Sequence, residues 1–199
     1  IYTPTHTLSL HDALPIYGNT DILLDNFLRG VEEEGVETET IYLRDYVTQP
    51  CIGCERCRKD KTCTRLYDGM QLLYPKFEES KGLVMGSPSH NYNVTSWIKA
   101  FIDRLYPYYD FTEDRPRNYS SRLKGQGRKA IVFGICEQPD MDGMGYTLDA
   151  MSKPLETLGY EIESKFPVTS YFDKGAVSRD EKILQSAYQQ GRKLAKKIV

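Results

Sequence analysis

Apolar and polar residues follow two different periods along this chain. Residues 18–35 carry apolar side chains at the three- and four-residue spacing of a helix, and residues 36–43 alternate as a strand does. The same two patterns recur further along, predicting helices over 68–80, 93–105, 143–160 and 178–199, and strands over 81–88, 128–136 and 161–170. This alternation predicts an α/β fold, in which a parallel sheet is covered by helices on both faces.

Two stretches fit neither pattern. Residues 106–127, "YPYYDFTEDRPRNYSSRLKGQG", form a long polar-aromatic segment, and loops of this length in a compact domain are often functional or mobile. Residues 7–16, "TLSLHDALPI", stand where the first strand of such a fold belongs, although Asp12 and Pro15 suit a buried central strand poorly. One strand is therefore expected to be missing in front of the first helix.

The composition excludes several classes of protein. Of the 199 residues, 40% are hydrophobic and 27% are charged, with a formal net charge of -2, which is typical of a soluble globular domain. Lysine and arginine are balanced by acidic residues, so nucleic acid is not an expected partner. No apolar run approaches the roughly 20 residues of a membrane span, and the N-terminus lacks the basic residues of a signal peptide. We therefore expect a cytoplasmic protein that binds neither nucleic acid nor membrane.

Four of the five cysteines lie within residues 51–63, "CIGCERCRKDKTC", and are Cys51, Cys54, Cys57 and Cys63. In a cytosolic chain such a group indicates a metal site or redox chemistry more than disulfides. Four thiolates are the ligand set of a [4Fe–4S] cluster, although the ferredoxin motif has a proline after its last cysteine where this chain has Thr64. Structural zinc and unliganded or redox-active thiols remain the other interpretations. Basic side chains in the segment either offset the charge of a cluster or form a solvated loop: Arg56, Arg58, Lys59 and Lys61.

Three further segments lie where ligands bind in an open parallel sheet. Ligands bind there at the carboxyl ends of strands, and unpaired N–H groups at a helix N-terminus attract anions such as phosphate. The first segment is Gly18-Asn19-Thr20, for which a plain helix cap is the alternative interpretation. The second is residues 86–104, "GSPSHNYNVTSWIKAFIDR", and the third follows residues 128–136.

Residues 86–104 resemble the flavin loop of the NADPH-dependent FMN reductases, in which a Gly-Ser-Pro turn is followed by an aromatic residue, a polar pair and a helix ending in Phe-Ile-Asp-Arg. The cysteine spacing resembles that of the iron–sulfur flavoproteins, which have the flavodoxin fold. The resemblance runs from about Gly18 to Val199. It implies a doubly wound, flavodoxin-like sheet of five parallel strands in the order 2-1-3-4-5, bound FMN, a [4Fe–4S] cluster, and NAD(P)H as electron donor.

The resemblance also implies roles for residues. In that family the loop after the third strand lies against the flavin ring, and His90 stands here where a tyrosine is common, so its polarity and pH response differ. No acid–base pair is implied, because the flavin carries the chemistry. Electrons would pass between flavin and cluster to a small-molecule or protein acceptor, across the interface of a homodimer or a dimer of dimers. The implied cofactor-binding residues are Gly18, Asn19, Thr20, Pro88, Ser89, His90, Asn91, Tyr92, Asn93, Gly134 and Glu137.

The N-terminal segment has a different explanation. "TLSLHDALPI" resembles one reading frame of a widely used sequencing adapter, so residues 1–16 are expected to be an assembly artefact and residues 17–199 the domain. The family's phosphate loop is commonly Gly-Ser-Pro-Arg, and only the Gly18–Thr20 part of that loop remains. This chain is therefore expected to have lost the strand and loop that hold the flavin phosphate. Leu8, Leu10 and Leu14 have the apolar character to occupy the strand's place.

Three alternative functions stay open. The first is an enzyme without a cluster that reduces quinones, nitroaromatics or free flavin. The second is a partner-specific electron-transfer flavoprotein that does not turn over NAD(P)H. The third is a zinc-stabilised binding module with no redox role.

Overall fold

The computed structural model describes residues 6–11 and 17–199. At its centre lies a parallel sheet made of β1 (His6–His11), β2 (Glu37–Tyr42), β3 (Gly82–Pro88), β6 (Lys129–Ile135) and β7 (Glu161–Val168). The strands lie in the order β2-β1-β3-β6-β7, which is 2-1-3-4-5 when these strands are counted along the chain. The prediction of a doubly wound, flavodoxin-like α/β fold is confirmed.

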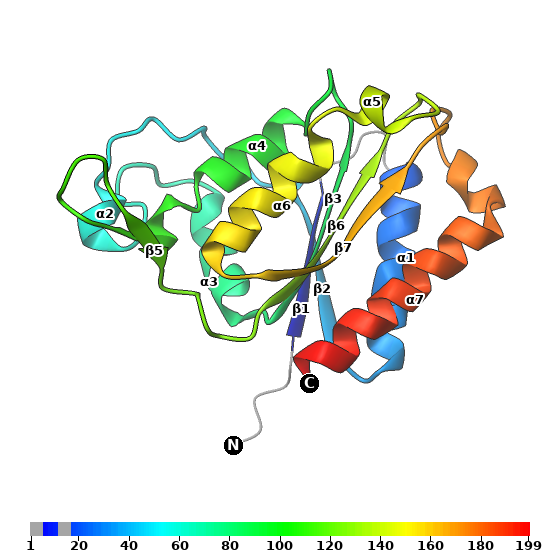
Figure 1. Cartoon of the computed structure of the whole chain (residues 1–199), viewed down its shortest axis with the longest axis horizontal. Helices are drawn as coiled ribbons and strands as arrows, with labels where there is room; N and C mark the ends of the chain where they lie inside the picture. Colours follow the sequence, from blue (N-terminus) through cyan, green and yellow to red (C-terminus); the bar gives the residue numbers. More distant parts are fainter. Residues whose placement is uncertain (1–5, 12–16) are drawn as a thin grey trace.

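Helices cover both faces of the sheet (Figure 1). α1 (Asn19–Glu33) and α7 (Glu181–Ile198) pack on one face, whereas α3 (Met70–Glu79), α4 (Ser96–Asp103) and α6 (Thr147–Leu158) pack on the other. Neighbouring residues of a strand point to opposite faces, so Val132 of β6 joins the core under α3, α4 and α6, while Phe133 joins the core under α1 and α7. Within residues 6–11 and 17–199, no helix is both long and apolar enough to cross a bilayer.

α1 and α7 approach each other so closely that their backbones touch. A Cβ atom on Gly30 would lie 2.0 Å from the carbonyl oxygen of Tyr188, and one on Gly191 would lie 1.9 Å from that of Phe27. Both distances are far below van der Waals contact, so only glycine fits at these two positions. This packing fixes the position of α1, whose N-terminus takes part in the site described below.

The structure divides the helix predicted over residues 143–160. α5 (Met141–Met144) is followed by α6, and Gly145 between them has a φ of 58°. A residue in this left-handed region interrupts the helix, and glycine adopts it without steric cost. The short elements elsewhere are α2 (Cys57–Asp60) and the 3-10 turns η1 (Leu43–Asp45), η2 (Tyr106–Tyr108) and η3 (Ala176–Arg179).

The segment predicted as a loop over residues 106–127 contains a β-hairpin. β4 (Tyr109–Phe111) pairs antiparallel with β5 (Tyr119–Ser121). The Tyr119 ring lies 5.8 Å from that of Tyr109 and 6.0 Å from that of Phe111, measured between centroids. Cross-strand aromatic contacts of this kind stabilise a short hairpin, and the long-range pairing explains why a local pattern did not predict it.

The N-terminal segment contributes an inner strand of the sheet, so the prediction that a strand is missing in front of the first helix is wrong. β1 lies between β2 and β3, with Leu8 opposite both Glu39 and Leu83. Leu8 and Leu10 are fully buried, so the structure places these two leucines where the first strand was expected. Leu14, Asp12 and Pro15 lie outside the described residues. The adapter origin of residues 1–16 remains a prediction, because a strand forms from any sequence of suitable apolar pattern.

Candidate functional site

A cleft of about 640 Å³ opens at the carboxyl ends of the strands. It is lined by the start of α1, by the segments that follow β3, β6 and β7, and by Gly143 of α5. The predicted site residues that line it are Gly18, Asn19, Thr20, Pro88, Ser89, His90, Asn91, Tyr92 and Glu137. The fold thus gathers at one place segments that the sequence separates by more than a hundred residues. Clefts in this position are the usual ligand sites of open α/β sheets.

Two predicted residues do not line this cleft. Asn93 accepts the N–H of Val94 through Oδ1, at 2.8 Å. Gly134 lies within β6, where a Cβ atom would be 3.0 Å from the sulfur of Met144. Their assignment as cofactor contacts remains a prediction, and in the structure they support the neighbouring loop and helix.

Residues 90–93 form a tight turn beside the cleft. Asn91 and Tyr92 both have positive φ values, 51° and 65°. The N–H of Asn93 donates to the carbonyl oxygen of His90 at 3.1 Å, and the N–H of His90 donates to that of Asn93 at 2.8 Å. Two central residues with positive φ define a type I′ turn, a conformation that is unfavourable for tyrosine. The turn leaves Tyr92 61% exposed at the cleft.

The connection between α5 and α6 holds this turn in place. The N–H of Tyr146 donates to the carbonyl oxygen of Tyr92 at 2.8 Å, and the Ser89 hydroxyl donates to that of Met144 at 3.1 Å. A Cβ atom on Gly145 would lie 2.4 Å from the same Tyr92 oxygen. Glycine at position 145 is therefore required both by its positive φ and by the close approach of the turn.

The N-terminus of α1 already has an acceptor from the chain itself. The N–H groups of Tyr17 and Gly18 both donate to Oδ2 of Asp21. The Asn19 side chain donates to the carbonyl oxygen of Asp173 and accepts the N–H of Val177, each at 3.0 Å. A helix N-terminus is a natural anion site, and here a carboxylate takes the N–H of the N-cap residue Gly18 and that of Tyr17 before it.

A buried histidine lies beside this N-terminus. His11, the last residue of β1, is fully buried, with Nδ1 3.1 Å from Oδ1 of Asp21. Its ring packs edge-on against Tyr42, with centroids 4.6 Å apart. Burial lowers the pKa of His11 to about 4, against the opposing effect of the Asp21 charge. The imidazole is therefore neutral at neutral pH and adds no positive charge to the α1 end of the cleft.

Sequence reasoning missed one side of the cleft, the segment after β7. The residues of this segment that line the cleft are Tyr171, Phe172, Asp173 and Lys174. The rule that pointed to the ends of β3 and β6 applies equally to β7, so the signal was available. Lys174 brings a positive charge and Phe172, 75% exposed, a second aromatic surface to the site.

The four clustered cysteines line a second pocket, of about 210 Å³, together with Arg104 and Tyr106. Burial, and then the nearby Cys51, Cys63 and Cys54, raise the pKa of Cys57 to about 11, as expected where thiols crowd together without a metal. All five cysteines of the chain are free of disulfides. In the described part of the chain, no group of three or more His, Cys, Asp or Glu side chains is arranged to hold a metal ion.

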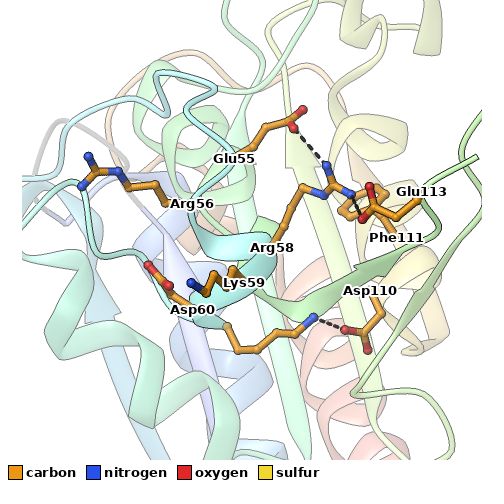
Figure 2. A pocket seen from close by; sticks show the side chains of 9 residues that line it. Glu55, Arg56, Arg58, Lys59, Asp60, Asp110, Phe111 and Glu113 are labelled. Carbon is orange, nitrogen blue, oxygen red and sulfur yellow. Dashed lines mark hydrogen bonds and ion pairs between the residues drawn. The ribbon is translucent and has the colours of Figure 1, made fainter.

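The basic residues of the cysteine segment line a neighbouring cavity, of about 620 Å³, next to β4 (Figure 2), and Arg56 lines the cysteine pocket as well. Arg58 pairs with Glu55 at 3.1 Å and with Glu113 at 3.0 Å, and Lys61 pairs with Asp110. Carboxylates thus neutralise these two cations locally. These two residues therefore suit a solvated loop better than a role in offsetting the charge of a cluster. Arg104, which sequence reasoning did not single out, is the arginine that lies buried at the cysteine pocket.

Known proteins resemble this chain at the level of both sequence and fold. Residues 9–119 match the NADPH-dependent FMN reductase family. An iron–sulfur flavoprotein of Archaeoglobus fulgidus is 32% identical over 190 residues, covering 91% of this chain and 88% of that protein. An iron–sulfur flavoprotein of Methanocaldococcus jannaschii is 37% identical over 90 residues, a match that spans 45% of this chain and 46% of the relative.

The fold has counterparts among solved structures. An NAD(P)H:quinone oxidoreductase from Methanothermobacter marburgensis superposes with a TM-score of 0.68 over 96% of this chain and 100% of that one, at 17% identity. At this identity the likeness concerns the fold alone. The family match covers more than half of the chain, and the A. fulgidus relative aligns over most of its length; this chain therefore belongs to the NADPH-dependent FMN reductase family.

Proposed function

We propose that this protein is an FMN-dependent oxidoreductase that takes electrons from NAD(P)H and passes them, through a [4Fe–4S] cluster, to a separate acceptor. The observation that carries the proposal is the convergence of segments with a flavin-binding pattern on one cleft of about 640 Å³. A cavity of several hundred Å³ at the strand ends suits a cofactor of this size. Family membership supports the same cofactor.

The residues of the cleft would bind different parts of FMN. Tyr92 and the turn of residues 90–93 would lie against the flavin ring, because the turn is held rigidly and exposes an aromatic surface. Thr20 and the start of α1 would face the phosphate. When bound, FMN supplies hydride acceptance from a nicotinamide and the release of electrons singly or in pairs. A turn fixed before the ligand arrives lowers the ordering cost of binding.

We propose that the cysteine pocket holds a cluster and not a zinc ion, as the names of the relatives suggest. The four cysteines line a space of about 210 Å³. Zinc requires its sulfur ligands at about 2.3 Å from one ion, whereas a [4Fe–4S] cluster is wider and takes one thiolate at each iron. We propose Cys51, Cys54, Cys57 and Cys63 as its ligands. When bound, the cluster supplies one-electron transfer.

The two sites lie apart in one chain. Figure 1 shows α2, within the cysteine segment, at the opposite end of the molecule from α5 and the start of α7. We therefore propose that the cleft of one copy works with the cysteine pocket of another, in a homodimer or a dimer of dimers.

The absorption spectrum of protein reconstituted anaerobically with FMN, iron and sulfide tests the proposed function. We expect flavin bands at about 370 and 450 nm and a shoulder at about 400 nm, with rapid bleaching by NADPH. Cys57→Ala should lose the shoulder and keep the flavin bands. Colourless protein with stoichiometric zinc would refute the redox function, and flavin that NADPH fails to bleach would favour an electron carrier.

Gly145→Ala is expected to weaken FMN binding by about tenfold or more. The new Cβ would lie 2.4 Å from the carbonyl oxygen of Tyr92 and would displace the turn. Fluorescence quenching of FMN on titration measures the affinity. Gly125→Ala is the matched control, because Gly125 also has a positive φ, 81°, but has nothing within 4 Å of its Cβ position. Equal affinities for the two variants would show that the turn does not contact the flavin.

A further inference from the structure

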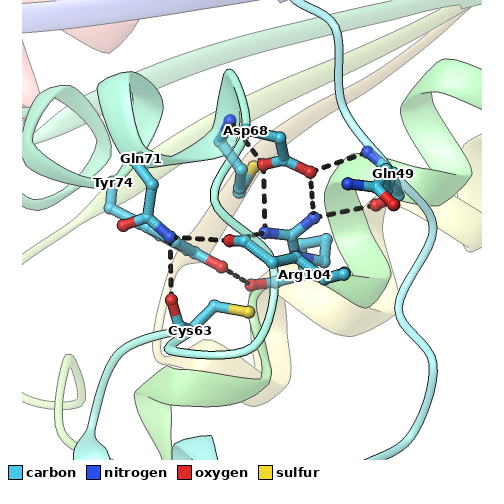
Figure 3. A network of polar contacts seen from close by, with 8 residues as sticks. Gln49, Cys63, Asp68, Gln71, Tyr74 and Arg104 are labelled. Atoms are coloured by element: carbon cyan, nitrogen blue, oxygen red, sulfur yellow. Dashed lines mark hydrogen bonds and ion pairs between the residues drawn. The ribbon is translucent and has the colours of Figure 1, made fainter.

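The cysteine-bearing segment has no apolar core of its own. Leu43 and Met70 are buried, but no residue as a whole is buried over residues 44–69 between them. Ordering a segment of this length costs conformational entropy, and only the half-buried Tyr46 and Cys63 of this segment pack against the hydrophobic core. Polar contacts must therefore hold it, and several of them converge on Arg104, which directly follows α4 (Figure 3).

The Arg104 guanidinium joins the two stems of the segment. Nη1 donates to the carbonyl oxygen of Gln49, before the first cysteine, and to Oδ2 of Asp68, after the last one, each at 2.8 Å. Nη2 donates to Oδ1 of Asp68 at 3.1 Å, and Asp68 also accepts the Gln49 N–H at 2.8 Å. Figure 3 shows these contacts around a single planar group. Only the rigid fork of arginine makes such a set of bonds.

This ion pair is almost inaccessible to water. The side chains of Arg104 and Asp68 are 1% and 4% exposed. A buried pair of charges is retained only where its hydrogen bonds are well made, and removing one partner leaves the other charge uncompensated. The Tyr74 hydroxyl donates to the Arg104 carbonyl oxygen at 2.8 Å, which fixes the backbone from which the guanidinium extends.

Arg104 also lines the cysteine pocket. Its Nε–H is buried without a hydrogen-bond partner within the described residues. A buried donor without an acceptor is unfavourable. Gln71 anchors the same region, since its Nε2 donates to the carbonyl oxygen of Cys63 at 2.8 Å. Sulfur atoms held in this pocket would supply the acceptor that the Arg104 Nε–H lacks.

We propose that Arg104 is the positioning residue of the cysteine site. Its guanidinium fixes the two stems so that the four thiols face one pocket, and its charge and Nε–H face the sulfur atoms of a bound cluster. The second role rests on the proposed [4Fe–4S] cluster, whereas the first concerns the chain alone. Hydrogen bonds and nearby charge are the means by which proteins stabilise thiolate-bound clusters.

Hydrogen exchange in the cluster-free protein, followed by iron loss to a chelator after reconstitution, tests both roles. Arg104→Lys is expected to speed exchange over residues 44–69 by about tenfold, and iron loss by at least as much. Arg128→Lys is the matched control. Arg128 is 3% exposed and donates to the carbonyl oxygens of Phe77 and Ser80 at 2.8 and 2.6 Å, outside the cysteine segment.

The outcomes separate the two proposals. If Arg104→Lys changes exchange over residues 44–69 no more than Arg128→Lys does, the positioning role is refuted. If the unaltered protein takes up no iron while Arg104→Lys still exposes the segment, the cluster is refuted and the positioning of the thiols stands. Should Arg104→Lys fail to fold, Asp68→Asn provides the same comparison, because it keeps the side-chain shape and removes the charge that the guanidinium pairs with.

Discussion

Lowering the pH from neutral to about 4 is expected to reduce the free energy of unfolding by about 3 kcal/mol through one residue, His11. Burial lowers the pKa of His11 from 6.5 to about 4 in the folded protein. The unfolded chain regains the ordinary value and binds a proton first as the pH falls. Stability is therefore fully present above about pH 6.5, declines as the pH falls, and stops declining below about pH 4.

Other charged and titrating groups also change stability with pH, and the measurement must separate their effects from that of His11. Asp21 favours the protonated form and Arg44 opposes it, but both effects are smaller than that of burial. Carboxylates with a lowered pKa, such as Asp68, lose their contribution to folding stability only below their ordinary pKa. The pH range of that loss therefore lies below the range in which His11 titrates. Urea denaturation across this pH range gives the free energy directly.

His11→Phe keeps a ring against Tyr42 and removes the titrating group. The variant should show a flat stability profile between about pH 6.5 and 4, whereas the unaltered chain shows a slope. A His90→Phe variant is the control, since His90 is exposed. The same slope in His11→Phe would mean that the acid sensitivity arises elsewhere.

The fold could be predicted from local patterns because each element shows its own period. Residues 130–136 form a continuous apolar run, and β6 supplies both cores from alternate positions. Predicted boundaries failed where a distant contact decides the conformation. Gly145 ends one helix and begins another because the turn at Tyr92 approaches it, and those residues are far apart in the sequence.

The candidate site could be predicted as far as it depends on strand ends. Pro88 ends β3 and Glu137 follows β6, and the same rule would have found Lys174 after β7. Arg104 belongs to the Phe-Ile-Asp-Arg motif, but its pairing with Asp68 carries no signal in the sequence, because the two residues lie 36 positions apart until the fold brings them together. The buried contacts of His11 are likewise invisible in the sequence.

Replacing residues 12–15 by Gly-Ser-Pro-Arg is expected to raise the affinity for FMN by at least about tenfold and to leave that for riboflavin unchanged. Residues 12–16 contain Asp12 and neither lysine nor arginine. At the start of α1, Asp21 takes the N–H groups of Tyr17 and Gly18, and His11 is neutral at neutral pH. At the start of α1 a phosphate therefore meets the Asp21 carboxylate and an uncharged imidazole, and the sequence of residues 12–16 supplies no cationic side chain.

Riboflavin is the internal control, because it has the same ring and lacks the phosphate. Charge-assisted hydrogen bonds from the new serine and arginine contribute about 1.5–3 kcal/mol each, and about 1.4 kcal/mol corresponds to tenfold in affinity. Fluorescence titration of both ligands against both chains gives the four dissociation constants. A chain with Pro15→Gln in place of Pro15→Arg in the graft shows how much of the gain comes from charge. If the unaltered chain already prefers FMN to riboflavin as strongly as the graft does, residues 12–16 bind the phosphate, and their interpretation as adapter sequence is wrong.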